Sequence, residues 1–458
     1  MDEETVKNTI DNAEEILKEC FDMLLEFKHG EGNFNAILFD FQPKLADCLY
    51  GLMLFYKALQ KEKQQLITIK NNYNKKDFSE LMSRNASFSK MVSKTIELGK
   101  SLGDAFAWFF FCDNRIELDK HFDHEPTGLY VSGIGGLGEL EFIKNNKFID
   151  GFFVLYHGIT TMLRIGDFSL YDARLGIVGV GELKTMRNGD KLNIAANVTS
   201  KVKLCIDGAK HISNSKSFEC NIQRLQNDFP KLRNQLSMHS ELMKAEGSTK
   251  SDEIYAEYEY GLLDQLQQNN SMAINSDKSL LLLAQYSQFD NLFSILSQKE
   301  DAIKPPDNFF ENAQNLITNC NDLDSFIIGH IANQVNRLSI PILWWNISNK
   351  LCRDIYFGKV SIITVFNPAK LLMCYVNDGF TVSMGCEFKN IKITKEFQNN
   401  EISIGNFESI CYLITNGLMK TNAVYESARL ITKAIEAGEF EPNTSISMQI
   451  HLNNFGKH

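Results

Sequence analysis

The stretch from Gly151 to Thr185, GFFVLYHGITTMLRIGDFSLYDARLGIVGVGELKT, decides how the fold is interpreted. It contains an apolar segment followed by two strands that a polar turn joins. Because side chains of a strand alternate between its two faces, Glu182 and Lys184 share one face and Leu183 points into the core. The many apolar residues before Glu182 indicate a central strand, so two charged groups are expected on one side of an otherwise buried sheet.

Charged groups in such a place need a partner, because burying an unpaired carboxylate or ammonium group is costly. A divalent metal supplies one: Asp167, on the neighbouring strand, would join Glu182 in binding a hard cation such as Mg²⁺ through oxygen. Lys184 would then orient the attacking water and stabilise developing negative charge. The alternative, which stays open, is a solvated cross-strand pair of Glu182 and Lys184. Asp172 lies in the turn, where an aspartate usually bonds its own backbone.

Gly166-Asp167, fifteen positions before Glu182-Leu183-Lys184 on a strand hairpin, resembles the motif of the PD-(D/E)XK superfamily, the restriction-endonuclease-like nucleases. The resemblance covers residues 125–215 and implies an α/β nuclease-like core, a mixed central sheet flanked by helices. It implies that Asp167, Glu182 and Leu183 bind the metal, Mg²⁺ with Mn²⁺ as a substitute, and that Lys184 assists the water. Gly166 stands where the proline of the family name would be.

Members of this family often carry another glutamate on a helix before the hairpin. The segment GLGELEFIKNN offers Glu139 or Glu141, and Glu139 is the fourth catalytic candidate. Its position in the first turn of a helix would also be favoured by the helix dipole alone. The glycines before it, Gly133, Gly135 and Gly138, satisfy the G-x-G-x-x-G pattern of dinucleotide-binding turns. The next apolar segment ends in His157 and Gly158 rather than an acid, so we rank the nucleotide hypothesis below the nuclease; the loop could instead hold a phosphate.

The net charge of the chain, −10, argues against a protein that coats nucleic acid without specificity. A local basic region is nevertheless present from Leu183 to Lys216, where seven basic residues face two acidic ones. Such a run beside a metal site suits a nuclease that holds a polyanion, although a solvated lysine face would look the same.

Ten cysteines are scattered without a C-x-x-C pair, so they predict neither a zinc site nor a redox framework. The polar start MDEETVKN does not resemble a signal peptide, and the apolar run AFAWFFF at 105–111 is too short to span a bilayer. We therefore expect a cytoplasmic protein with no membrane partner.

Four regions are expected along the chain. Residues 1–124 form a helical region, because apolar residues recur at helical spacing in 3–29, 41–70 and 77–111. Residues 125–215 form the nuclease core, 216–303 a second helical region that includes SLLLLAQYSQFDNLFSILSQK, and 304–458 an α+β region. Two further local predictions are a polar linker at His121–Glu125 and a hairpin around Asn377-Asp378-Gly379.

The function expected from these residues is Mg²⁺-dependent hydrolysis of phosphodiester bonds, with DNA preferred to RNA as the substrate. We expect an endonuclease in bacterial restriction or antiviral defence against phage, by analogy with family members that carry large helical appendages. The alternatives are an RNA nuclease, or a noncatalytic nuclease-fold module that binds or senses a protein partner. Homo-oligomerisation is left open.

Overall fold

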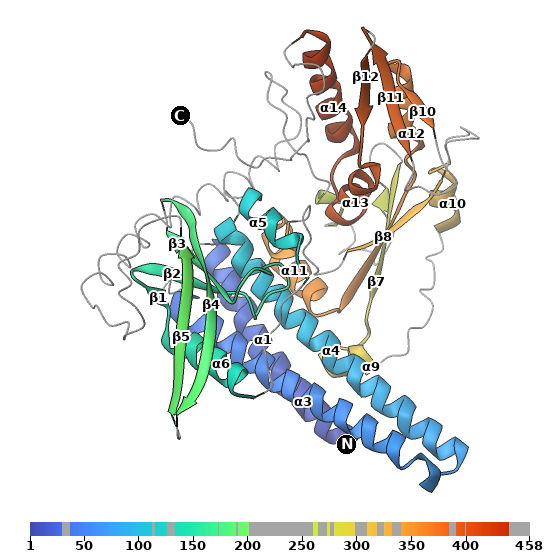
Figure 1. The fold of residues 1–458 in the computed structure, drawn as a ribbon. Helices are drawn as coiled ribbons and strands as arrows, with labels where there is room; N and C mark the ends of the chain where they lie inside the picture. The colour runs from blue at the N-terminus through green and yellow to red at the C-terminus, as the bar shows by residue number, and fades with distance from the viewer. Residues whose placement is uncertain are drawn as a thin grey trace.

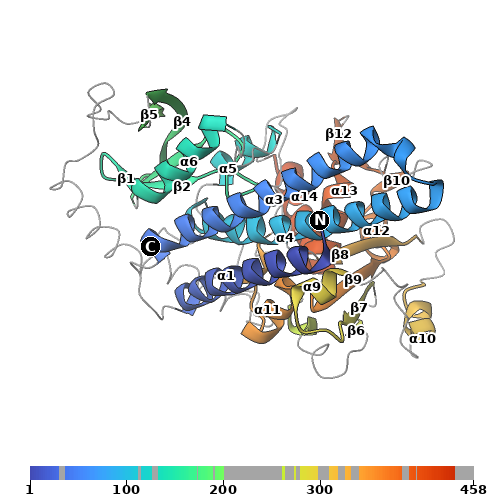
Figure 2. The ribbon, with the colours of Figure 1, turned by 90° about the horizontal axis from the view of Figure 1, so that it is seen from below.

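The computed structural model describes residues 1–29, 37–111, 115–125, 133–172, 174–188, 191–200, 260–263, 273–274, 279–297, 309–317, 325–331, 340–383, 391–398 and 400–438. Its N-terminal part is a set of long helices, as the apolar periodicity predicted: α1 (Glu3–His29), α3 (Gln42–Thr68) and α4 (Lys75–Phe111). A π-turn, η1 (Ile37–Phe41), leads into α3, and a 3₁₀-turn, η2 (Lys70–Asn72), joins α3 to α4. The three helices lie side by side (Figure 2).

Two shorter helices follow. Helix α5 (Arg115–Phe122) takes in His121, and α6 (Gly133–Asn145) begins at the first glycine of the G-x-G-x-x-G pattern. The polar linker predicted to begin at His121 is therefore wrong for that residue, which is helical and only 3% exposed. The glycines belong to the helix itself, so they do not form the strand-to-helix turn of a dinucleotide site.

A five-stranded antiparallel meander follows, in the order β1-β2-β3-β4-β5. Its strands are β1 (Phe148–Ile149), β2 (Phe152–Tyr156), β3 (Phe168–Asp172), β4 (Gly176–Asn188) and β5 (Lys191–Ser200). Every pairing among these strands is antiparallel, so the mixed sheet expected for residues 125–215 is not what the described residues form. The physical reason is local: short turns join β1 to β2, β3 to β4 and β4 to β5, and the loop from β2 to β3 holds no helix that could carry the chain across to a parallel strand.

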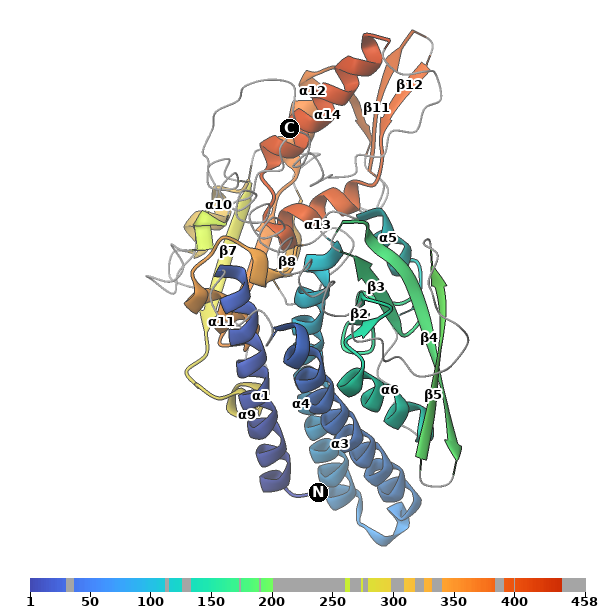
Figure 3. The same ribbon diagram turned by 90° about the vertical axis from the view of Figure 1, so that its left-hand side faces the viewer.

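Helix α6 covers one face of this sheet. Phe142 of α6 stacks near Phe168 of β3, with ring centroids 5.5 Å apart, and a Cβ at Gly138 would lie 1.9 Å from Oγ1 of Thr185. Phe168 in turn lies over Gly181, where a side chain would collide with its ring. The face of β4 that carries Gly181 and Thr185 is thus the packed one. Figure 3 shows α6 between this sheet and α3.

The loop between β2 and β3, residues 157–167, is docked on α4 by a buried carboxylate. Asp104 is 1% exposed and accepts hydrogen bonds from the Thr161 and Met162 amides at 2.7 and 2.9 Å and from the Thr161 hydroxyl at 2.5 Å. Its neighbour Gly103 meets the Ile159 carbonyl so closely that a Cβ would lie 2.0 Å from the oxygen. The helical region therefore sets the position of the loop.

Two buried histidines complete the anchoring of the loop. Nδ1 of His121 accepts hydrogen bonds from the Arg164 and Ile165 amides, at 2.8 and 3.1 Å. His157 contacts the Gly166 carbonyl through Nδ1 and the Ser169 hydroxyl through Nε2, at 3.1 and 2.8 Å. Burial lowers the pKa of His121 to about 4 and that of His157 to about 3, so both rings are neutral near pH 7.

The C-terminal part contains two further antiparallel sheets (Figure 1). The first has the order β6-β7-β9-β8, from β6 (Ala273–Ile274), β7 (Leu280–Tyr286), β8 (Ile327–Ile331) and β9 (Val360–Phe366). The second has β10 (Thr381–Ser383), β11 (Lys392–Phe397) and β12 (Asn400–Ile404). The helices are α9 (Leu292–Ser297), α10 (Phe309–Gln314), η3 (Ile342–Trp344), α11 (Asn349–Tyr356), α12 (Ala369–Asn377), α13 (Phe407–Gly417) and α14 (Thr421–Glu436).

Two local predictions fail here. The start of SLLLLAQYSQFDNLFSILSQK was expected to be helical, but Leu280–Tyr286 is strand β7, which pairs with β9. A short apolar run is compatible with a buried strand as well as with a helix, and here its pairing with β9 makes it a strand. The apolar run before Asn377-Asp378-Gly379 was expected to be the first strand of a hairpin, but Ala369–Asn377 is helix α12, and Gly379, with φ of +85°, follows the helix end.

One large apolar core joins the N-terminal helices to the C-terminal part, and a small second cluster forms around Leu281 and Leu316. Trp344 of η3 donates from its indole nitrogen to the Ala105 carbonyl of α4 at 2.9 Å, and its ring stacks near Trp108. The buried carboxylate of Glu14 on α1 accepts from the Leu292 amide at the start of α9 at 2.8 Å. No helix among the described ranges has both the length and the apolar character needed to cross a bilayer.

Substituting Asp104 with Asn should remove a pH-dependent loss of folding stability. Burial raises the pKa of Asp104 to about 6, above its value of 3.8 in an unfolded chain, so its contribution to stability is present at low pH and is lost as pH rises through 6. Between pH 4 and pH 8 the wild type should therefore lose roughly 2 kcal/mol relative to Asp104→Asn. Urea unfolding of both proteins at several pH values measures this difference. If the free energies of unfolding of the two proteins changed in parallel with pH, the raised pKa of a buried Asp104 would be contradicted.

Gly103→Ala should destabilise the protein, while Gly51→Ala, the same change inside α3, should not. A Cβ at Gly103 would overlap a backbone oxygen that no side-chain rotation can move, a type of overpacking that costs about 1 to 3 kcal/mol. At exposed Gly51 the same atom meets nothing within 4 Å, and alanine should gain about 0.5 to 1 kcal/mol of helix stability. Thermal unfolding of both variants compares them. Equal shifts of Tm in the two variants would show that the β2–β3 loop does not pack closely against α4 at Gly103.

Candidate functional site

The candidate site lies where β3 begins and β4 continues alone beside β5. Strand β3 pairs with β4 only as far as Phe168 opposite Gly181, whereas β4 and β5 stay paired from Gly179 to Asn188. Beyond Gly181 one edge of β4 has therefore lost its neighbour. Backbone groups on this edge need other hydrogen-bond partners.

Asp167 supplies one of these partners. Its amide donates to the Gly181 carbonyl at 2.8 Å, and its carboxylate oxygen Oδ2 accepts from the Leu183 amide at 2.5 Å. The preceding residue, Gly166, has φ of +70°, and a Cβ there would lie 2.7 Å from the Gly181 carbonyl oxygen. Only glycine lets the chain approach β4 this closely, which explains why a glycine precedes the aspartate here.

The structure brings Asp167 and Glu182 together. Extending the register by one residue places Asp167 opposite Glu182, and the pKa of Asp167 is raised by burial and further by the negative charge of Glu182. The Leu183 amide opposes these effects, because its hydrogen bond stabilises the ionised carboxylate. Two neighbouring acids of this kind repel one another, and a hard cation would relieve the repulsion.

Leu183 lies within reach of the same position. A strand residue directs its N–H and its C=O toward the same neighbour, and the Leu183 N–H is directed at Asp167. Its carbonyl oxygen therefore faces the edge of β4 where the Asp167 carboxylate lies, which suits a third oxygen ligand. The Leu183 side chain, on the packed face, contacts the apolar core.

Glu182 and Lys184 project from the face of β4 opposite α6, and both side chains are exposed. Their shared face agrees with the strand periodicity. The burial of this face, which was the reason given for a metal, is not what the structure shows: only the first half of β4, up to Gly181, is mostly buried. The reason is that β3 begins only at Phe168, opposite Gly181, so the end of β4 belongs to a two-stranded ribbon with one face in solvent.

Glu139 lies on α6, half-buried, on the helix that covers the packed face. Among the described residues, Glu139 does not join Asp167 and Glu182 in a cluster of three metal-ligating side chains. The other candidate on the helix, Glu141, is exposed and accepts a hydrogen bond from the Asn145 side chain at 2.7 Å.

Asp172 behaves as a turn residue, as expected. Its carboxylate oxygen Oδ1 accepts from the amides of Arg174 and Leu175, at 2.9 and 3.0 Å. Of the basic run predicted from Leu183 to Lys216, Lys184 and Arg187 lie on β4, while Lys201, Lys203, Lys210 and Lys216 lie outside the described residues.

The residues that hold the loop of Asp167 were not found from the sequence as a site. Asp104 is embedded in the apolar run SLGDAFAWFFF, and His157 ends an apolar strand. A lone acid or histidine surrounded by apolar residues is a usable sign of a buried polar anchor, since such groups must be hydrogen-bonded. The pattern does not say which backbone segment they bind.

Comparisons with known proteins add no information about this site. The chain matches no family model, no curated protein and no solved structure.

Proposed function

We propose that the chain is a Mg²⁺-dependent nuclease that hydrolyses phosphodiester bonds, with DNA as the substrate. The observation that supports this best is the position of Asp167 beside Glu182 at the unpaired edge of β4, with the Leu183 backbone between them. This is the donor set that the resemblance to the PD-(D/E)XK nucleases implies. A role in bacterial restriction or defence against phage remains part of the proposal, by analogy with that family.

The described residues fit a magnesium ion. Mg²⁺ takes oxygen ligands and keeps several waters, so two carboxylates and one carbonyl suffice. One oxygen of Asp167 is used by the Leu183 amide, and the second oxygen is available for the ion. When bound, the ion would stabilise negative charge on the phosphate and lower the pKa of a water ligand.

Lys184 has the second role in the proposal. It is exposed on the same face as Glu182, two residues further along β4. An ammonium group at this place can orient a water toward the phosphorus atom and offset the charge that develops as the bond breaks. Glu139 is a weaker candidate, because its helix packs on the other face of β4.

The protein that carries this activity is proposed to be cytoplasmic. Cys20, Cys48, Cys352, Cys374 and Cys411 are free thiols within the described ranges. Burial raises the pKa of Cys20, Cys48, Cys352 and Cys411 to about 12, so these thiols are unreactive. Unpaired cysteines of this kind suit a reducing compartment.

A second candidate is a noncatalytic module that keeps this hairpin and binds or senses a protein partner. The observation in its favour is the exposure of Glu182 and Lys184, since exposed groups need no metal to compensate their charge. The absence of a three-residue ligand cluster among the described residues points the same way.

Glu182→Gln and Lys184→Gln should each abolish Mg²⁺-dependent cleavage, with a loss of at least about a hundredfold, while leaving the free energy of unfolding within about 0.5 kcal/mol. The side chains are exposed, so their replacement disturbs no core packing. Cleavage of supercoiled plasmid DNA and of a matched RNA, each with Mg²⁺ or Mn²⁺, provides the measurement.

Glu141→Gln is the matched control, since it removes an exposed carboxylate from α6, and it should cleave like the wild type. Glu139→Gln should reduce the rate less than Glu182→Gln. Full activity in both β4 variants would remove the site assignment, and an inactive wild type that binds no metal would favour the noncatalytic module.

Cation affinity should increase as the pH rises. The pKa of Asp167 is raised above its usual value, so protons compete with the ion at low pH and leave when it binds. Calorimetric titration with Mn²⁺ at pH 5 and pH 8 should show tighter binding at pH 8. In Asp167→Asn the affinity should be weaker and nearly independent of pH. Binding that is unchanged in this variant would place the ion elsewhere.

A further inference from the structure

The end of the α3–α4 hairpin carries a strong positive charge. We name residues 57–90 the basic arm; they comprise the second half of α3, η2 and the first half of α4. The arm contains eight lysines and arginines and three acidic residues, a net charge of +5 in a chain of net charge −10. In Figures 1 and 3 the arm extends beyond the neighbouring elements at the lower end of the molecule.

One of the three acidic residues of the arm pairs with a charge that lies outside the arm. Glu62 pairs with the N-terminal ammonium group of Met1 and accepts from the Asn85 side chain at 3.1 Å. Asp77 accepts from the Asn74 side chain at 2.7 Å, at the start of α4. The positive charges of the arm are therefore poorly compensated from within it.

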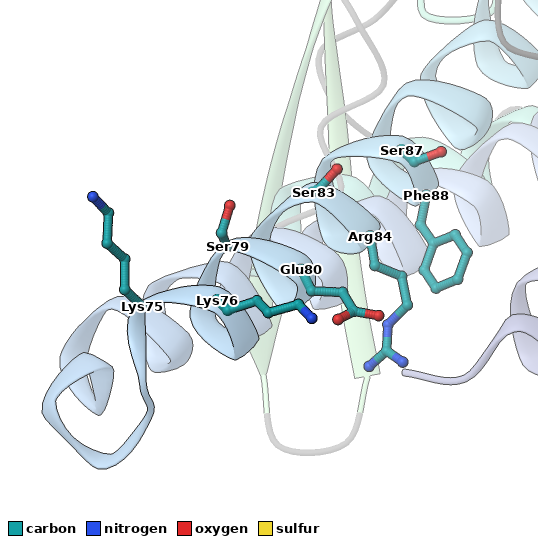
Figure 4. A pocket seen from close by; sticks show the side chains of 8 residues that line it. All are labelled: Lys75, Lys76, Ser79, Glu80, Ser83, Arg84, Ser87 and Phe88. Carbon is teal, nitrogen blue, oxygen red and sulfur yellow. The ribbon is translucent and has the colours of Figure 1, made fainter.

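A shallow groove runs along the arm on the surface of α4. Its volume is about 880 Å³, and two rows of side chains at four-residue spacing line it: Lys75, Ser79, Ser83 and Ser87 in one row, and Lys76, Glu80, Arg84 and Phe88 in the other. Figure 4 shows the three serine hydroxyls on one side of the helix, with Glu80 between Lys76 and Arg84. All but Phe88 are exposed.

The cationic side chains of this groove form no ion pairs among the described residues. Within the described part of the chain, none of Lys75, Lys76 and Arg84 forms an ion pair with a carboxylate. Glu80 is the one acid on the groove, so the groove has an excess of two positive charges. Successive members of each row are about 6 Å apart along the helix axis. The groove thus offers three cationic groups and three hydroxyl donors along one side of the helix.

We propose that the basic arm binds the sugar-phosphate backbone of double-stranded DNA along this groove. Lysine, arginine and serine side chains are the groups that proteins direct at phosphate oxygens. The inference rests on the proposed nuclease function for the identity of the ligand, and it assigns that function a substrate-holding surface apart from the catalytic residues. Along the groove an anionic membrane surface fits less well, because Phe88, its large apolar side chain, is only 5% exposed, and the exposed apolar side chains of the arm, Ile67, Ile69 and Tyr73, lie outside the groove.

The position of the arm suits a second contact on a long polymer. The β4–β5 hairpin and the basic arm extend toward the same end of the molecule in Figures 1 and 3, and α6 contacts both α3 and β4. A duplex held by the arm would raise the local concentration of phosphodiester bonds for the site on β4. Binding and cleavage are then separate properties that different residues control.

The test is duplex binding by the full chain in EDTA, where no cleavage occurs. Fluorescence anisotropy with a labelled 30-base-pair DNA should show that Lys75→Glu/Lys76→Glu/Arg84→Glu raises the Kd at least about tenfold and makes the slope of log Kd against log salt shallower by about two to three. The milder Lys75→Gln/Lys76→Gln/Arg84→Gln should give a smaller change in the same direction. Circular dichroism confirms that both variants are folded.

The matched control reverses three exposed lysines elsewhere, Lys350→Glu/Lys392→Glu/Lys433→Glu, which changes the net charge equally and should alter the Kd less than threefold. The proposal would be overturned if the arm variants bound the duplex as tightly as the wild type, or if the control lost as much affinity as they do. It would also be overturned if the wild type bound no duplex, or if the arm variants lost binding to phosphatidylserine vesicles but not to DNA. If the wild type binds DNA through the arm but cleaves none, the proposed nuclease function is refuted and the proposed DNA binding by the arm still holds.

Discussion

The docking of the β2–β3 loop on α4 is the interaction on which the rest of the candidate site depends. A fully buried carboxylate, Asp104, accepts three hydrogen bonds from Thr161 and Met162, and Gly103 beside it lets the loop backbone touch the helix. The loop ends at Asp167, so a contact made in the N-terminal helices determines where an acid of the sheet lies. Burial of a polar group is costly unless it is fully hydrogen-bonded, which makes this anchor specific.

The edge of β4 connects the fold to the chemistry proposed for it. Strand β3 begins one residue after Asp167, and the aspartate side chain satisfies the Leu183 amide that β3 leaves without a strand partner. This local break puts two acids next to each other, raises the pKa of one of them and exposes Lys184 on the same ribbon. The basic arm, at the end of the α3–α4 hairpin, adds a positively charged surface to a chain whose net charge is −10.

Local patterns predicted the helices well and several strands poorly. The apolar spacing in residues 3–29, 41–70 and 77–111 predicted three helices whose observed bounds differ by only a few residues. In contrast, Leu280–Tyr286 was mistaken for helix and the apolar run before Asn377-Asp378-Gly379 for strand. A long periodic segment carries many independent indications of helix, whereas a run of seven apolar residues carries few. The alternation of Glu182, Leu183 and Lys184 was predicted correctly, because period two is a property of the strand itself.

The sequence by itself determined which residues share a face, which segments are helical and which residue types could bind a cation. It also contained the glycine before Asp167 and the excess of lysine in the basic arm. Only the tertiary structure decided that Asp167 lies beside Glu182, that Glu182 and Lys184 face solvent, and that His121 is buried in a helix. These properties depend on where β3 begins and on what α4 and α6 cover, and both are set by contacts between segments far apart in the chain, which no local pattern encodes.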